Sequence, residues 1–113
     1  MESQFLGSAL EMLILEVAAQ GRTYGYEVAQ TVAERSNGVF ELKEGSLYPA
    51  LHRLERNKLL RSIWGEADGR RRKYYELTEA GHAELAARKR SWLSFTAGVN
   101  GVLGTPRIGL ADS

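Results

Sequence analysis

The fold is decided by the stretch Leu60-Arg61-Ser62-Ile63-Trp64-Gly65-Glu66-Ala67-Asp68-Gly69-Arg70-Arg71-Arg72-Lys73-Tyr74-Tyr75-Glu76-Leu77. Its two ends, residues 60–64 and 73–77, carry the β-branched and aromatic side chains that favour strands. Residues 65–69 between them are rich in turn formers, so we predict a two-stranded hairpin whose loop is longer than a tight turn. Because a lone hairpin is only marginally stable in water, this one must rest on other parts of the chain. Trp64, Tyr74 and Tyr75 offer the bulk for that contact.

Two amphipathic helices are predicted at the start of the chain. The first spans about 5–20, and Gly21 is expected to stop it. The second spans about 24–36, with Thr23 as its cap and Asn37-Gly38 as its end, because both of these residues tolerate the left-handed conformation. The first helix has apolar positions at helical spacing: Leu6, Leu10, Leu13, Ile14 and Val17. The second has apolar positions at Tyr26, Val28, Ala29, Val32 and Ala33.

A third helix is predicted over about 46–58. Ser46 is its expected cap, and Pro49 is expected in the first turn, where its missing N–H costs nothing. The expected buried stripe is Leu47, Leu51 and Leu54. The residues expected on the other faces are Tyr48, His52, Arg53 and Arg56, which give the helix a polar, basic side. Three short helices followed by a hairpin form the order of a winged helix-turn-helix unit.

The last predicted helix starts at Thr78 and runs to about residue 103. Glu79 in its first turn suits the helix dipole. Leu85, Trp92 and Val99 repeat every seven residues, and Phe95 and Val102 follow the interleaved register. A helix of this length has little of its own chain left to bury such a stripe, so the stripe predicts self-association. We expect Gly104-Thr105-Pro106 to end the helix and the tail to Ser113 to be loose.

The net charge of +1 conceals a strong asymmetry along the chain. Residues 1–52 carry three basic and seven acidic side chains, residues 53–73 carry eight basic and three acidic ones, and residues 74–113 carry four of each. Four of the cations, Arg70 to Lys73, follow the tip of the predicted hairpin. Phosphates dominate the affinity of proteins for DNA, and the third helix of such a unit enters the major groove. The pattern therefore predicts a DNA-binding surface.

The sequence thus predicts a mainly α (α+β) fold, a winged helix-turn-helix with a two-stranded β wing and a long C-terminal dimerisation helix. Residues 1–78 form the expected DNA-binding domain, residues 79–104 the dimerisation helix, and residues 105–113 a flexible tail. A winged helix that serves only as a protein-interaction module, without specific DNA binding, is the alternative. Such a module does not need a wing with four cations, so the charge asymmetry argues against it.

Several classes of protein are excluded by composition. The chain has no cysteine, only two histidines at unrelated places and no Gly-rich phosphate loop, so we predict no enzyme, no metal site and no cofactor. No apolar run approaches the length of about 20 residues that spans a bilayer, and the N-terminus does not have the pattern of a signal peptide. These features fit a cytoplasmic protein.

Three sequence blocks resemble the PadR-like transcriptional regulators. They are Tyr24-Gly25-Tyr26-Glu27-Val28, Gly45-Ser46-Leu47-Tyr48-Pro49-Ala50-Leu51-His52-Arg53-Leu54-Glu55 and Gly69-Arg70-Arg71-Arg72-Lys73-Tyr74-Tyr75-Glu76-Leu77-Thr78-Glu79-Ala80-Gly81. The resemblance covers about residues 5–95, with the blocks in the correct order. It implies a homodimeric repressor that binds inverted-repeat operators in double-stranded DNA. The short chain resembles the branch with a single C-terminal dimerisation helix, and in many members a small molecule or stress signal releases the DNA.

The resemblance also implies which residues meet DNA. From the third helix these are Ser46, Tyr48, Pro49, His52 and Arg53, and from the wing Arg70, Arg71, Arg72 and Lys73. The hydroxyls of Ser46 and Tyr48 suit phosphates, whereas His52 and Arg53 are expected to reach base edges. For Tyr24 and Tyr26, contact with the DNA backbone and packing within the protein are equal alternatives.

In some short members, flat aromatic ligands bind between tryptophans of the two last helices. Trp92 falls at the matching position, so the resemblance implies a small aromatic or lipophilic effector there. Packing across the dimer seam is the alternative role for this tryptophan. The expected ligand or dimer interface comprises Leu85, Trp92, Phe95, Val99 and Val102. Beyond it, the sequence from Ala97 to Gly104 is rich in small residues and departs from the ligand-binding pattern.

Overall fold

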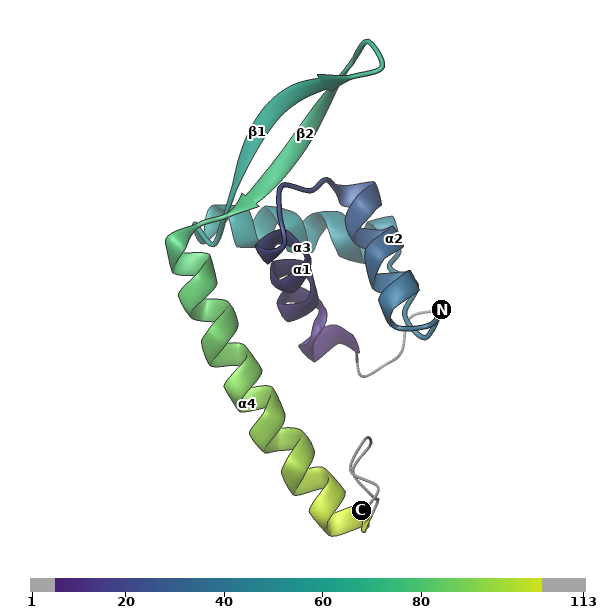
Figure 1. The fold of residues 1–113 in the computed structure, drawn as a ribbon, viewed down its shortest axis with the longest axis vertical. Helices are drawn as coiled ribbons and strands as arrows, with labels where there is room; N and C mark the ends of the chain where they lie inside the picture. The colour runs from purple at the N-terminus through teal and green to yellow at the C-terminus, as the bar shows by residue number, and fades with distance from the viewer. Residues whose placement is uncertain (1–5, 105–113) are drawn as a thin grey trace.

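Three short helices and a hairpin precede one long helix, as the sequence predicts (Figure 1). The computed structural model describes residues 6–104. The helices are a 3-10 turn at Leu6–Ser8, α1 at Leu10–Ala19, α2 at Gly25–Arg35, α3 at Glu44–Arg56 and α4 at Glu79–Leu103. The strands β1, Leu60–Ala67, and β2, Arg70–Leu77, form one antiparallel sheet. The predicted mainly α, winged helix-turn-helix fold is confirmed.

The core lies where α1, α2 and α3 meet the base of the hairpin and the first half of α4. It is filled by the apolar stripes that the sequence predicts, because each helix can bury only one face. Its completely buried large side chains come from α1, α2, α3 and β1: Ile14, Leu15, Val28, Leu51, Leu54 and Leu60. Tyr26, which was predicted at an apolar position of α2, is instead 64% exposed.

Both α2 and α3 begin at residues other than the predicted caps. Thr23 does not cap α2, because its backbone N–H and carbonyl both pair with Tyr75, and its hydroxyl lies 2.7 Å from the Glu27 carboxylate. Tyr24 is therefore the residue before the helix. In α3, the Lys43 carbonyl accepts from the N–H groups of Ser46 and Leu47, so the helix starts two residues earlier than predicted. Pro49 consequently lies inside the helix rather than in its first turn.

The hairpin is longer and its turn tighter than predicted. The two strands pair in continuous register from Leu60 with Leu77 to Ala67 with Arg70. Only Asp68 and Gly69 remain between them, and both have positive φ, 54° and 76°. Such a two-residue turn matches the twist of paired strands, which explains why pairing continues to the tip. The hairpin, called the wing below, projects away from the helices (Figure 1).

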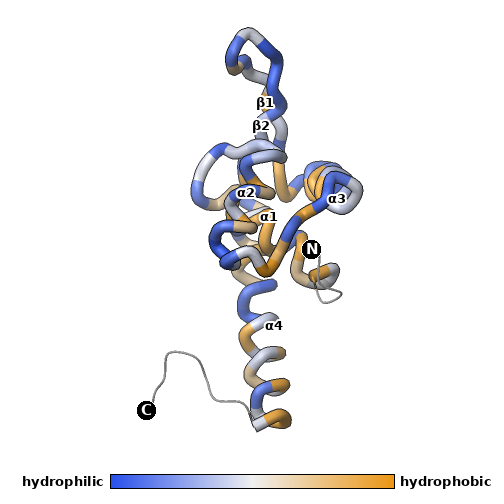
Figure 2. Tube along the Cα trace, turned by 90° about the vertical axis from the view of Figure 1, so that its right-hand side faces the viewer, coloured by the Kyte–Doolittle hydropathy of each residue, from blue (hydrophilic) through white to orange (hydrophobic). Residues whose placement is uncertain are grey.

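The long helix α4 has two different halves. The Thr78 hydroxyl accepts from the Gly81 N–H at 2.9 Å and so caps the helix as predicted, while Gly104 ends it with a φ of 72°. Leu85 in the first half is buried in the core of its own chain, which removes it from the predicted exposed stripe. The second half extends beyond the other helices and is partly apolar (Figure 2). Thr105, Pro106 and the predicted loose tail lie outside the described residues.

The molecule measures 52 × 28 × 24 Å along its principal axes, and the wing and α4 project from opposite ends of the body (Figure 1). Within residues 6–104, no helix is both long enough and apolar enough to cross a membrane.

Candidate nucleic-acid interface

A concave surface of about 530 Å³ lies between the start of α2, one face of α3 and the strand β2. We call it the α2–α3–wing concavity. It is lined by Tyr24, Gly25, Tyr26, Tyr48, His52, Arg71, Arg72, Lys73 and Tyr75. Five of the nine residues predicted to meet DNA from the third helix and the wing are thus brought together: Tyr48, His52, Arg71, Arg72 and Lys73. Tyr24 and Tyr26, for which DNA contact was one of two alternatives, line the same surface.

Strand geometry divides the four cations of β2 between two faces. Successive side chains of a strand point to opposite sides, so Arg71 and Lys73 share a face with the buried Tyr75. Arg70 and Arg72 share the other face with Tyr74. The cations therefore have different neighbours, although they are consecutive in the sequence.

Aromatic rings hold the two arginines that line the concavity. The guanidinium of Arg72 lies 4.0 Å from the ring centre of Tyr24, and that of Arg71 lies 4.4 Å from the ring centre of Trp64. Tyr24 in turn meets Tyr74 edge-to-face, with ring centres 5.7 Å apart. A cation–π contact orients a guanidinium without neutralising its charge. Both arginines are consequently placed in the concavity with their positive charge available.

Lys73 is held by an acidic residue instead. Its Nζ lies 3.1 Å from the carboxylate of Glu55, and the Ser62 hydroxyl donates to the same carboxylate at 2.6 Å. The hydrogen bond from Ser62, followed by that from Lys73, lowers the pKa of Glu55 below its ordinary value. Burial alone would lower the pKa of Lys73, but Glu55 and Tyr75 raise it. The pair is therefore charged on both sides at neutral pH.

Tyr48 reaches the concavity because α2 starts with a glycine. A Cβ on Gly25 would stand only 2.6 Å from the Tyr48 hydroxyl oxygen and 2.7 Å from the ring. A Cβ carbon does not come this close to atoms to which it is not bonded, so any larger residue at position 25 would displace the tyrosine. The glycine lets the first turn of α2 lie directly against the face of α3.

The other predicted DNA-binding residues lie outside the concavity. Ser46 and Pro49 are on the first half of α3, and Arg70 follows the tip of the wing. Arg53 is directed toward α1, where its Nε donates to Glu11 at 2.8 Å. The structure therefore places Arg53 away from His52, the residue with which it was predicted to reach base edges.

Sequence reasoning missed three residues that shape this surface: Gly25 makes room for Tyr48, Trp64 stacks on Arg71, and Glu55 holds Lys73. It also missed Glu11, which draws Arg53 away from the concavity. The proximity of Trp64 and Arg71 becomes visible only once the Asp-Gly turn fixes the register of the two strands. No local pattern relates Glu11 to Arg53, because these residues are 42 positions apart.

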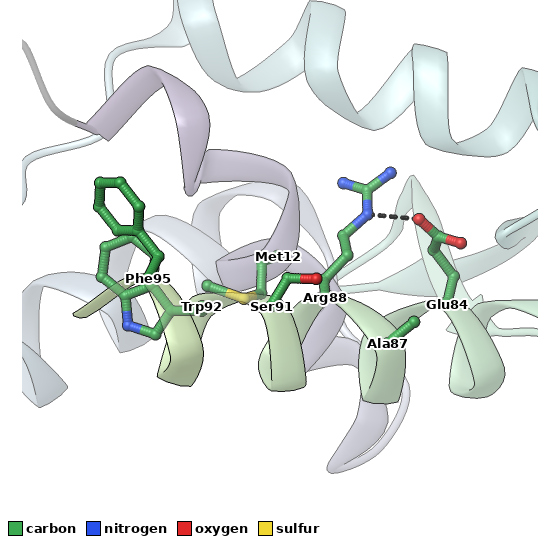
Figure 3. A pocket seen from close by; sticks show the side chains of 7 residues that line it. All are labelled: Met12, Glu84, Ala87, Arg88, Ser91, Trp92 and Phe95. Carbon is green, nitrogen blue, oxygen red and sulfur yellow. Dashed lines mark hydrogen bonds and ion pairs between the residues drawn. The ribbon is translucent and has the colours of Figure 1, made fainter. Parts of the chain in front are cut away.

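A second hollow, of about 410 Å³, lies between α1 and α4. It is lined by Met12, Glu84, Ala87, Arg88, Ser91, Trp92 and Phe95. Figure 3 shows the rings of Trp92 and Phe95 at one end of it and the ion pair of Arg88 with Glu84 at the other. Arg88 also donates to Glu11 at 3.0 Å, so Glu11 joins Arg53 of α3 to Arg88 of α4. This hollow contains Trp92 and Phe95 of the predicted ligand or dimer interface.

No group of three or more His, Asp or Glu side chains within the described range is arranged to hold a metal ion.

Known proteins are similar to this chain in sequence and fold. The Transcriptional regulator PadR-like family matches residues 14–87. A transcriptional regulator of Mycobacterium tuberculosis is 38% identical over 88 residues, which cover 78% of this chain and 79% of that protein. Among solved structures, a transcriptional regulator from Clostridium thermocellum has a TM-score of 0.82 and 28% identity, covering 88% of this chain and 97% of the other. A PadR family transcription regulator from Clostridium difficile has a TM-score of 0.75 and 36% identity, with coverages of 84% and 98%.

The matched family and these three proteins are transcriptional regulators rather than enzymes. The family match extends from α1 through the wing into α4, and thus includes every residue of the α2–α3–wing concavity. The chain belongs to the PadR-like family of transcriptional regulators.

Proposed function

We propose that the protein is a dimeric, sequence-specific DNA-binding repressor of the PadR type. The observation that carries this proposal is the α2–α3–wing concavity, in which a basic strand, a polar helix face and the start of α2 meet. An α-helix fits the major groove, where base pairs present distinguishable edges, and cations beside it fit the phosphates. The concavity combines both requirements on one side of the molecule.

In this proposal the residues have different tasks. His52, exposed on α3, reads base edges in the major groove. Arg71 and Arg72 contact phosphates, and Arg70 beside the tip extends that contact along the backbone. Tyr24 orients Arg72 through its ring, and Tyr48 donates its hydroxyl to phosphate. Ser46 and Pro49 approach the backbone where α3 enters the groove.

The exposed end of α4 supports self-association. Apolar side chains remain in contact with solvent there, with Val102 as much as 89% exposed: Trp92, Leu93, Phe95, Val99, Val102 and Leu103. A contiguous apolar surface of this kind is a typical protein interface. A second copy is the natural partner, because most soluble oligomers are symmetric homodimers. Residues 79–104 then act as the dimerisation helix of a DNA-binding domain formed by residues 1–78.

We propose that a small aromatic or lipophilic effector releases the DNA. The hollow between α1 and α4 supports this proposal, since it offers the rings of Trp92 and Phe95 beside Met12. These groups suit flat apolar molecules. Because Glu11 links Arg88 of this hollow to Arg53 of α3, occupation of the hollow has a direct route to the DNA-facing helix.

The proposal is tested by footprinting the protein on a duplex that carries an inverted repeat. A dimer should protect two half-sites whose centres lie about one helical turn apart. Protection of one isolated half-site by a monomer would contradict the proposal.

Binding of an effector is tested by tryptophan fluorescence during titration with planar aromatic compounds. The experiment uses the Trp64→Phe variant, in which Trp92 is the remaining tryptophan and therefore the reporter.

A further inference from the structure

Lys73 differs from the arginines beside it in having its charge matched by a carboxylate. Its side chain is 29% exposed and that of Glu55 is 31% exposed, so water screens this pair less than it screens a fully exposed one. The ammonium group also lies 5.4 Å from the ring centre of Tyr75, on the side toward the core. Lys73 is therefore drawn toward α3 rather than extended into solvent.

Glu55 is held in place by a second contact. Ser62 donates to Oε2 of this carboxylate, while Lys73 contacts Oε1. The two partners come from different strands, Ser62 from β1 and Lys73 from β2. The carboxylate is thus fixed between α3 and the wing, and its position does not depend on Lys73 alone.

A paired cation contributes little to binding that is driven by counterion release. Affinity for the DNA backbone grows with the number of phosphates that available cations neutralise. A phosphate that approached Lys73 would have to compete with a carboxylate 3.1 Å away. Arg71 and Arg72 face aromatic rings, and among the described residues no ion pair joins either arginine to a carboxylate.

We propose that Glu55 limits the sequence-independent affinity of the interface for DNA, because it withholds the Lys73 cation from phosphate. The inference rests on the proposed DNA-binding function. Binding to phosphates is the same for every sequence, so withholding one cation per protomer lowers the affinity for random DNA. A larger share of the binding energy at an operator then comes from base contacts of α3.

The salt dependence of DNA binding tests this inference. Glu55→Gln keeps the shape of the side chain and an acceptor for Ser62 but removes the charge that holds Lys73. We expect the slope of log affinity against log salt to steepen by about 0.9 per protomer. Affinity for a random duplex at 0.1 M salt should rise by roughly an order of magnitude per protomer, and affinity for an operator should rise alike.

Two further variants show whether Lys73 causes the change. Lys73→Met alone should leave the slope unchanged, because this cation is already paired in the wild type. The double variant, Glu55→Gln with Lys73→Met, should return to the wild-type slope. Glu34→Gln removes one negative charge from the exposed side of α2 and controls for net charge; it should leave the slope unchanged.

Three results with these variants would overturn the inference about Glu55 and Lys73. A slope that flattens by about 0.9 per protomer in Lys73→Met would overturn the inference, even if Glu55→Gln failed to fold. An unchanged slope in a folded Glu55→Gln protein, or an equal change in Glu34→Gln, would also overturn it. A wild-type protein that shows no salt-dependent binding to duplex DNA overturns the proposed function itself, which is a distinguishable result.

Discussion

At the scale of single residues, the wing consists of cations with unequal roles. Arg71 and Arg72 face aromatic rings, whereas the positive charge of Lys73 is balanced by the carboxylate of Glu55. The sequence showed the four cations and their place beside the turn. It could not show their partners, which depend on the pairing register and on how α3 and the segment before α2 lie against the hairpin.

Removing Arg71 and Arg72 together should weaken DNA binding on every sequence. Phosphate contacts carry no sequence information, so an operator and a random duplex should lose affinity alike. The slope of log affinity against log salt should flatten by about 0.9 for each phosphate that is no longer neutralised. Arg90→Ala, on an exposed position of α4, is the matched control and should have no such effect. An unchanged slope in the Arg71→Ala, Arg72→Ala variant would mean that the wing does not touch the DNA backbone.

Gly25→Ala should reduce DNA affinity without unfolding the protein. The new methyl group would occupy the place of the Tyr48 ring, but that side chain is 37% exposed and can swing outward. We expect a change of less than about 1 kcal/mol in the free energy of unfolding, since alanine also suits a helix better than glycine. The affinity loss should match that of Tyr48→Ala, and combining both substitutions should add nothing. Additive losses in this double-mutant cycle would show that Gly25 acts independently of Tyr48.

At the scale of elements, Glu11 ties three helices together. Its carboxylate on α1 accepts from Arg53 of α3 and from Arg88 of α4. Burial alone would raise the pKa of Glu11, but the two arginines hold it below the ordinary value. The two ion pairs of Glu11 therefore stabilise the fold fully above a pH of about 4.3, the ordinary pKa of a glutamate. This stabilisation is lost as the pH falls through the lowered pKa of Glu11.

Glu11→Gln should lower the free energy of unfolding by about 1–2 kcal/mol at pH 7, with solvent screening of Arg53 keeping the loss modest. The difference from the wild type should shrink below about pH 4, where the wild-type carboxylate is protonated as well. Chemical denaturation at several pH values measures this directly, with Glu34→Gln as a control. A difference that stays constant down to pH 3 would show that the charge of Glu11 does not stabilise the fold.

Most elements could be predicted from the sequence because each one has a local pattern. The stripes Leu47, Leu51 and Leu54 and the Thr78 cap are examples that the structure confirms. The starts of α2 and α3 were predicted wrongly, because several nearby residues are plausible caps and tertiary contacts decide between them. The backbone of Thr23 pairs with Tyr75 at the edge of the sheet, and the sequence around residue 23 does not reveal this pairing.

At the scale of the whole molecule, α4 extends from the domain and keeps an apolar surface in solvent. A helix of 25 residues is about 37 Å long, and its own chain covers only the first half. The sequence predicted a stripe beginning at Leu85, but that residue belongs to the core. Heptad spacing alone cannot tell a position that packs on the same chain from one that packs on a partner.

Trp92→Ala should loosen the proposed dimer. Trp92 and Phe95 lie 5.9 Å apart between ring centres and together form the largest apolar group on the second half of α4. Sedimentation at decreasing protein concentration should show dissociation of the variant where the wild type remains dimeric. Arg90→Ala removes an exposed side chain of α4 that lies outside this apolar surface and should have a smaller effect. A Trp92→Ala dimer that persists at the lowest concentrations would show that the predicted apolar stripe is not the dimer interface.

Recognition of a specific DNA sequence by the concave, basic surface of a dimer is the property on which the proposed function depends. Selection of bound duplexes from a random pool tests it most directly, because the protein alone chooses the sequence. We expect enrichment of a palindromic motif with two half-sites about one helical turn apart. Recovery of DNA with no enriched motif, or with a single unrepeated half-site, would contradict it.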